Sequence, residues 1–222
     1  HGLDLPVSGP LLVVLMLYVL NIAFGFFTSS QQKEQIKGMF GQYVAPAHID
    51  RLLDDPAALS FAGESKKMTV LFSDIRGFTD MSETLSATDL KNLLNRYFTP
   101  MTAIIFEQQG TIDKYVGDMI MAFWGAPLND PQHELHAVMA AMLMQKKQAA
   151  LREEFERIGL PAIHTGIGIN TGAMNVGDMG STYRRAYTVL GDAVNLGSRL
   201  ESITKFYGAA ILVSESTYAA VQ

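Results

Sequence analysis

The hydrophobic pattern of the chain opens with an uncharged apolar run. Residues 11–27 read LLVVLMLYVLNIAFGFF, and as a helix they would span about 26 Å, near the lower limit for crossing a bilayer core. A cleavable signal peptide fits poorly, because no basic region precedes the run and no small-residue cleavage site follows it. We therefore expect a transmembrane helix with flanks over residues 1–30, with a buried core helix as the alternative. Lys33 and Lys37 follow the run and Asp4 precedes it. This charge bias places the C-terminal side of the run on the cytoplasmic side of an inner or plasma membrane.

A polar segment over residues 31–66 connects this run to the rest of the chain, and we expect it to be a helical linker. Its first part carries apolar residues at helical spacing, a stripe that favours packing against a second copy. The members of this stripe are Ile36, Phe40, Tyr43 and Val44.

From residue 67 to residue 222 the pattern changes to short apolar runs that alternate with longer helical periods. This alternation predicts a single α/β domain, an α+β sandwich. The pair Gly117-Asp118 between two apolar runs is a hairpin signal, and Ser86 with Asp89 forms a capping box. We expect strands at 68–73, 111–116, 119–124, 163–169, 174–178, 186–190 and 209–213, and helices after Ser86, at 131–158 and at 192–206.

The helix after Leu190 carries a candidate functional flank. Asp192 is a plausible N-cap, and apolar residues at spacings of three and four predict a buried face. Asn195 and Arg199 lie four residues apart and so share a flank of that face, at the edge of a cleft or simply in solvent. The predicted buried face consists of Ala193, Leu196, Leu200 and Ile203.

The charge and the cysteine content of the chain narrow the range of possible functions. The chain has 17 basic and 22 acidic residues, a formal net charge of -5 and no cysteine. Nucleic-acid binding is disfavoured because it needs clustered Lys and Arg, and disulfides and thiolate metal sites are excluded. A polyanionic substrate would have to be held by a few placed donors and by metal ions.

Two aspartates lie where such ions could bind. Asp74 ends a buried strand in FSDIRGFT, and Asp118 lies at the tip of the predicted hairpin. Carboxylates placed this way can share Mg²⁺ through oxygen ligands. Taken alone, each is better explained as an ordinary turn or cap residue.

Three segments together resemble the signature segments of class III nucleotidyl cyclases, in the same order. They read LFSDIRGFT, DKYVGDMIMAFWG and YTVLGDAVNLGSRLE, and the resemblance covers about residues 65–221. It implies a ferredoxin-like βαββαβ cyclase homology domain that pairs head to tail as a homodimer, with its sites at the interface.

The resemblance also implies a role for each matching residue, in a site that binds ATP and two Mg²⁺ or Mn²⁺ ions. Asp74 and Asp118 match the metal-binding aspartates, and Ile75 supplies a backbone carbonyl to metal. Lys114 and Thr188 match the base-selecting pair. The remaining matches are Gly77, Phe78 and Thr79 around the triphosphate, Asn195 at the ribose, Arg199 at the transition state and Arg184 at a phosphate.

The implied reaction is that of an adenylate cyclase, a phosphorus–oxygen lyase. The 3′-hydroxyl of ATP attacks its own α-phosphorus, and pyrophosphate leaves. Adenine offers an acceptor at N1 and a donor at its amine, which suits a lysine that only donates and a threonine that can accept. The alternatives are a guanylate cyclase, which Lys114 disfavours, and a non-catalytic nucleotide-binding or dimerising domain, which would typically lack a metal aspartate or the arginine.

The ends of the chain complete these expectations. It begins with His1 and ends at Gln222, shortly after a predicted helix start, so we expect a fragment of a longer protein. The family usually supplies a triphosphate-binding lysine from a hairpin further toward the C-terminus, and we therefore expect the C-terminus to be truncated.

Overall fold

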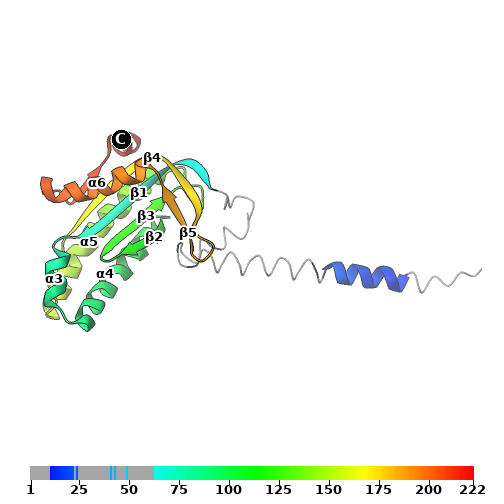
Figure 1. Cartoon of the computed structure of the whole chain (residues 1–222), viewed down its shortest axis with the longest axis horizontal. Helices are drawn as coiled ribbons and strands as arrows, with labels where there is room; N and C mark the ends of the chain where they lie inside the picture. Colours follow the sequence, from blue (N-terminus) through cyan, green and yellow to red (C-terminus); the bar gives the residue numbers. More distant parts are fainter. Residues whose placement is uncertain (1–10, 23, 25–40, 42, 44–48, 50–62) are drawn as a thin grey trace, which may run out of the picture. The chain divides into compact units, whose positions relative to one another are not determined.

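The structure is a computed structural model, and it describes residues 11–22, 24, 41, 43, 49 and 63–222. It falls into two units, residues 1–41 and residues 42–222, and each is described by itself (Figure 1). In the first unit, residues 11–22 are helical with exposed side chains. Within the described residues, no helix is both long enough and apolar enough to cross a membrane. The end of the predicted span at 25–27 and most of the predicted linker lie outside the described residues, so both stay predictions.

The second unit is a mixed α/β fold built on a largely antiparallel sheet. Its strands follow the order β2-β3-β1-β4-β5, and β6 joins β4 in parallel. The first four strands with α4 and α5 form a βαββαβ unit, which agrees with the predicted fold class. The strands are β1 (Glu64–Ile75), β2 (Thr111–Val116), β3 (Met119–Trp124), β4 (Thr165–Gly180), β5 (Arg185–Leu190) and β6 (Ile211–Val213). The helices are α3 (Phe78–Thr84), α4 (Ala87–Glu107), α5 (His133–Arg157), α6 (Asp192–Tyr207) and α7 (Glu215–Val221).

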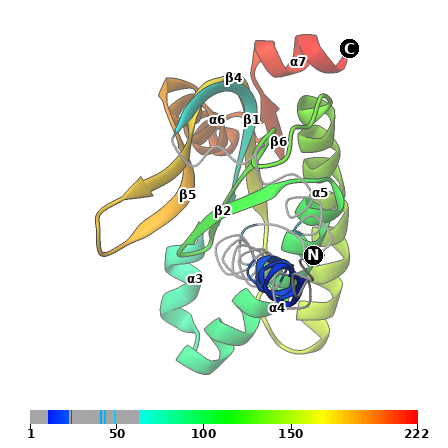
Figure 2. The same ribbon diagram turned by 90° about the vertical axis from the view of Figure 1, so that its right-hand side faces the viewer.

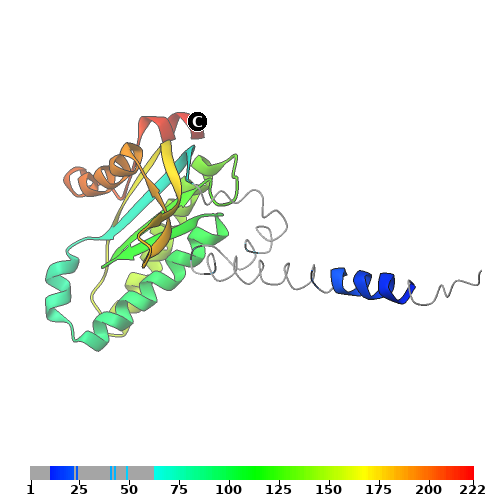
Figure 3. The ribbon, with the colours of Figure 1, turned by 45° about the vertical axis from the view of Figure 1, so that its right-hand side comes forward.

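Helices cover the sheet from both sides. Helices α4 and α5 pack on one face and α6 packs on the other (Figures 2 and 3). The main hydrophobic core lies under α4 and α5, where Leu71, Tyr97, Trp124 and Phe155 are fully buried. The opposite face also buries apolar residues, among them Val70 and Phe72, which lie against Gly197 of α6.

Local signals in the sequence are present in the structure. The hairpin turns at Gly117, whose φ of 64° is left-handed, and the Asp89 amide donates to Ser86 Oγ at 3.1 Å in the capping box. The two strands expected at 163–169 and 174–178 are instead one strand, β4. It stays continuous because β1 pairs along its first part, from Ile75↔Thr165 to Glu64↔Val176, and β5 pairs along its end.

The predicted buried face of α6 is half right, because Ala193 and Leu200 are half-buried whereas Leu196 and Ile203 are exposed. Leu196 and Ile203 are each 41% exposed, and the buried residues of the helix are Val194, Gly197 and Thr204. The N-cap is Gly191 rather than Asp192, which begins the helix. Periodicity pointed to the larger apolar residues, but the helix turns its small residues to the sheet.

Glycines on β4 explain this choice. Side chains alternate between the two faces of a strand, and on β4 the isoleucines at 167 and 169 belong to the core under α4 and α5. The intervening Gly168 faces α6, where a Cβ atom would lie 2.6 Å from the Gly197 carbonyl oxygen and 2.7 Å from Glu201 Cα. The helix backbone therefore rests almost directly on the strand.

This contact gives a stability prediction. Gly168→Ala should lower the free energy of unfolding by about 3 kcal/mol or more, because the new methyl meets backbone that cannot move aside. Thermal denaturation of residues 42–222 should show a drop of roughly 6–12 °C in the transition temperature.

Gly159→Ala is the matched control. It adds the same methyl group where no atom lies within 4 Å, at a φ of +75°, and so costs only about 1 kcal/mol of backbone strain. Equal losses for the two variants would contradict the close packing of α6 on β4.

Candidate active site

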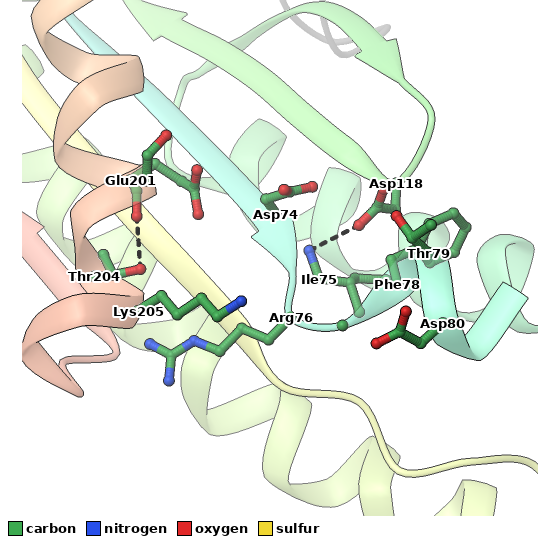
Figure 4. A pocket seen from close by; sticks show the side chains of 12 residues that line it. Asp74, Ile75, Arg76, Phe78, Thr79, Asp80, Asp118, Glu201, Thr204 and Lys205 are labelled. Atoms are coloured by element: carbon green, nitrogen blue, oxygen red, sulfur yellow. Dashed lines mark hydrogen bonds between the residues drawn. The ribbon is translucent and has the colours of Figure 1, made fainter.

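The two predicted metal-binding aspartates lie beside each other at one end of the sheet. Strands β1 and β3 run antiparallel, with Ser73 opposite Ile120, so the end of β1 lies next to the β2–β3 turn. Asp118 Oδ2 accepts a hydrogen bond from the Ile75 amide at 3.0 Å (Figure 4). Asp74 and Asp118, which the sequence analysis singled out separately, thus lie together at this end of the sheet.

The electrostatics of this place favour a cation. The pKa of Asp74 is raised to about 7, first by burial, then by a hydrogen bond with Asp118 and by the negative charge of Asp118 and, less, Glu201. A carboxyl that is costly to ionise beside a second carboxyl gains most from a positive charge between them. Within the described residues, no group of three or more His, Asp or Glu side chains gathers in ligand geometry. Asp74 and Asp118 therefore fit a Mg²⁺-type ion that takes its other oxygens from water, carbonyls and phosphates.

A pocket of about 420 Å³ surrounds these carboxylates. The predicted triphosphate loop forms one wall, where Gly77, at a φ of +69°, turns the chain from β1 into α3. Phe78 and Thr79 begin the helix, and first-turn amides have no partner inside a helix. All six residues predicted for metal and triphosphate line this pocket, namely Asp74, Ile75, Gly77, Phe78, Thr79 and Asp118.

The opposite wall contains charged residues that the sequence analysis missed. Glu201 and Lys205 come from α6, and Arg76 follows β1 (Figure 4). The Arg76 guanidinium donates to the Ala209 carbonyl, and burial raises the pKa of Glu201 while Arg76 lowers it. The spacing of four between Glu201 and Lys205 was a usable signal, but the wrong buried face for α6 hid it.

A second pocket, of about 720 Å³, holds the predicted base-selecting pair and Arg184. Lys114 Nζ donates to Thr188 Oγ1 at 3.4 Å. These residues belong to β2 and β5, the two ends of the strand order, so the sheet curls enough for its edge strands to meet. The pocket also contains Asp113, whose side chain is fully buried.

The predicted residues of α6 lie in neither pocket. Asn195 and Arg199 are exposed, and they are absent from the linings of the two pockets, which have no residue in common. Within the described part of this single chain, the predicted site residues therefore fall into three groups.

Comparison with known proteins identifies the family to which this chain is similar. Residues 61–222 match the family model described as the adenylate and guanylate cyclase catalytic domain. An adenylate cyclase of Anabaena cylindrica is 43% identical over 159 residues, which cover 70% of this chain and 31% of that relative. Adenylate cyclase 1 of Rhizobium meliloti is 36% identical over 69% of this chain and 23% of its own length. The chain thus spans about a third or less of these curated relatives.

Solved structures resemble the same region. The adenylyl cyclase CyaB from P. aeruginosa is 41% identical with a TM-score of 0.67, over 72% of this chain and 82% of that one. The guanylyl cyclase Cya2 is 38% identical with a TM-score of 0.67, over 72% and 80%. By sequence and by fold, the chain belongs to the family of adenylate and guanylate cyclase catalytic domains.

Proposed function

We propose that this chain is an adenylate cyclase that converts ATP to 3′,5′-cyclic AMP and pyrophosphate. The observation that carries the choice of ATP is the contact between Lys114 and Thr188. Lysine only donates hydrogen bonds and threonine can accept one, which matches N1 and the amine of adenine. Guanine presents a donor and an acceptor at those two positions and would oppose both side chains.

Asp74 and Asp118 would hold the divalent metal ions, Mg²⁺ or Mn²⁺, two in each site. A bound ion of this kind supplies charge neutralisation at the phosphates and eases deprotonation of the 3′-hydroxyl. The loop at Gly77, Phe78 and Thr79 would bind the triphosphate through backbone amides. Lys205 and Arg76 add positive charge to the same pocket, whose lining also holds the carboxylates of Asp74, Asp80, Asp118 and Glu201, so a polyanion would bind there together with the metal ions.

The separation of the three groups supports a homodimer with shared sites. Arg199 is exposed on α6 between Leu196 and Ile203, two apolar residues that the sheet leaves uncovered. A second copy that covered this apolar stripe would receive Arg199 and Asn195 at its surface. Arg199 would then stabilise charge that develops at the α-phosphate, and Asn195 would orient the ribose. A closed two-fold dimer repeats any such site twice.

Two other functions remain alternatives to be tested. A guanylate cyclase shares the fold, as the similarity to Cya2 illustrates. A non-catalytic domain would bind nucleotide without turnover, and the presence of Asp74, Asp118, Asn195 and Arg199 argues against it.

We also propose that residues 11–27 anchor the protein in an inner or plasma membrane, with the catalytic domain in the cytoplasm. The support is the uncharged run itself and the exposed apolar side chains of its helical part, residues 11–22. Exposed apolar surface of this extent favours lipid or another partner over water.

The first prediction concerns turnover. With Mg²⁺ or Mn²⁺, the chain should form cyclic AMP from ATP in preference to cyclic GMP from GTP, and Asp74→Asn or Asp118→Asn should lower kcat by about 1,000-fold or more, because each removes a charge that metal binding needs. Product chromatography measures both nucleotides, and thermal denaturation checks that the variants fold. Near-normal turnover by either variant would refute the metal assignment, and a GTP preference would favour the guanylate cyclase.

The second prediction tests the shared site. Asp74→Ala and Arg199→Ala chains should each be inactive alone, but a mixture of them should regain up to about half of wild-type activity per mixed dimer, because one interface collects both defects and the other collects neither. Differently tagged chains report how many mixed dimers form. Mixed dimers without activity above either parent would rule out the composite site.

The third prediction concerns the membrane. Deletion of residues 1–30 should move the protein from the membrane fraction to the soluble fraction, because it removes the apolar run. Sedimentation after expression, with and without detergent, measures the partition. Recovery of the undeleted chain in the detergent-free supernatant would contradict the anchor.

A further inference from the structure

Asp113 is a buried carboxylate that the roles assigned so far do not include. Its side chain is fully buried, and the pairing of β2 with β3 shifts register between Ile112 and Lys114. Asp113 is therefore the extra residue of a β-bulge. Neighbouring side chains on a regular strand point to opposite faces, whereas a bulge re-aims one of them. The bulge lets consecutive residues 113 and 114 form an ion pair, with Lys114 Nζ 3.0 Å from Asp113 Oδ1.

The other carboxylate oxygen connects Asp113 to β5. Thr188 Oγ1 donates to Asp113 Oδ2 at 2.6 Å, and the Val189 amide donates to the same oxygen at 3.3 Å. Burying a carboxylate is costly unless donors and a positive charge surround it. Asp113 has both, because Thr188 and the Val189 amide supply the donors and Lys114 supplies the positive charge.

These contacts decide which hydrogen-bonding capacity remains for a ligand. A threonine hydroxyl has one proton and two lone pairs, and Thr188 commits its proton to Asp113. Lys114 uses one lone pair of Thr188 Oγ1, which leaves one acceptor site. The Lys114 ammonium donates one proton to Thr188 and lies 3.0 Å from Asp113 Oδ1 as an ion pair, although that oxygen accepts no hydrogen bond. What is left is donor capacity on Lys114 beside one acceptor on Thr188.

We propose that Asp113 is a positioning residue that fixes the polarity of the base-reading pair and so selects adenine over guanine. The inference rests on the proposed function, because it assumes that the pocket of Lys114 and Thr188 receives the base. Without Asp113, the Thr188 hydroxyl could turn and donate to the carbonyl oxygen of guanine. Threonine alone reads either polarity, and the buried carboxylate removes that freedom.

The first experiment compares Asp113→Asn with wild type in the full chain, with ATP and GTP as substrates. An asparagine has one acceptor oxygen, so it cannot satisfy Lys114 on one side and both donors of β5 on the other. We expect the ratio of kcat/KM for ATP to that for GTP to fall by about tenfold or more, the size of one lost directional hydrogen bond. An unchanged ratio in a folded variant overturns the proposal.

Asp130→Asn is the matched control. Asp130 is also a buried carboxylate, with Oδ1 accepting from the Gln132 amide at 3.0 Å and Oδ2 paired with His136 Nδ1 at 2.7 Å. It lines neither pocket, so its loss should change stability but leave the ratio within about twofold. A ratio that falls equally in both variants would mean that any buried-carboxylate defect relaxes selectivity, and would overturn the proposal.

A double-mutant cycle tests whether Asp113 acts through Thr188. Thr188→Val removes the hydroxyl whose proton Asp113 holds. If Asp113 works through that hydroxyl, Asp113→Asn should change the ratio at least threefold less in the Thr188→Val background than alone. An undiminished effect would show that Asp113 acts elsewhere and would overturn the proposal.

A binding experiment on the wild-type chain needs neither a variant nor turnover. The probes are the triphosphates of N6-methyladenosine and 6-methoxypurine riboside, which match in size and share the N1 acceptor. Only the first carries a donor at position 6, so a Thr188 locked as acceptor should bind it about fivefold or more tightly. This preference with no cyclisation would refute the proposed function and support the inference. Equal affinity would overturn the inference even in an active cyclase.

Discussion

Helix α6 lies directly on strand β4 because glycines remove the side chains that would separate them. Gly168 on the strand lies against the helix backbone at Gly197 and Glu201, with no room for a Cβ at residue 168, and Gly197 lies against the side chains of Val70 and Phe72 on β1. A contact this close fixes both the height and the rotation of the helix. The rotation places Glu201 and Lys205 in the metal pocket and turns Arg199 outward. One steric constraint thus orients three charged residues of the candidate site.

A second constraint is the curl of the sheet. Strands β2 and β5 stand at opposite ends of the strand order, yet Lys114 and Thr188 touch across them. A twisted sheet of this size can bring its edges together, and here Asp113 on β2 accepts hydrogen bonds from Thr188 and Val189 on β5. The metal pocket and the base pocket then lie on different parts of the same sheet and share no residue. This division supports a site completed by a second copy.

The sequence predicted well whatever depends on local chemistry. The capping box at Ser86, the turn at Gly117 and the α+β class follow from turn chemistry and periodicity, whereas the βαββαβ order came from the family resemblance. Strand β1 places Asp74 where the strand ends. Leu196 and Ile203 of α6 were wrongly expected to be buried because periodicity favours large apolar residues, while the real contact depends on glycines across the sheet. Asp113 and Lys205 were missed for a related reason. The neighbours of Asp113 are set by a bulge, which no local pattern encodes, and the spacing of four between Glu201 and Lys205 was overlooked because another face of α6 was expected to be buried.

If Asp113 has the proposed role, base selection in this chain is a property of a network rather than of two residue types. An adenylyl cyclase and a guanylyl cyclase resemble this chain almost equally, at 41% and 38% identity, so overall similarity says little about the base. A hydroxyl can donate or accept, and Thr188 by itself therefore discriminates weakly. A buried carboxylate that takes the hydroxyl proton turns an ambiguous group into a directional one, and its ion pair with Lys114 keeps the adjacent donor in place. A change of base preference would accordingly require a change in the support at residue 113 as well as in the residues that face the ligand.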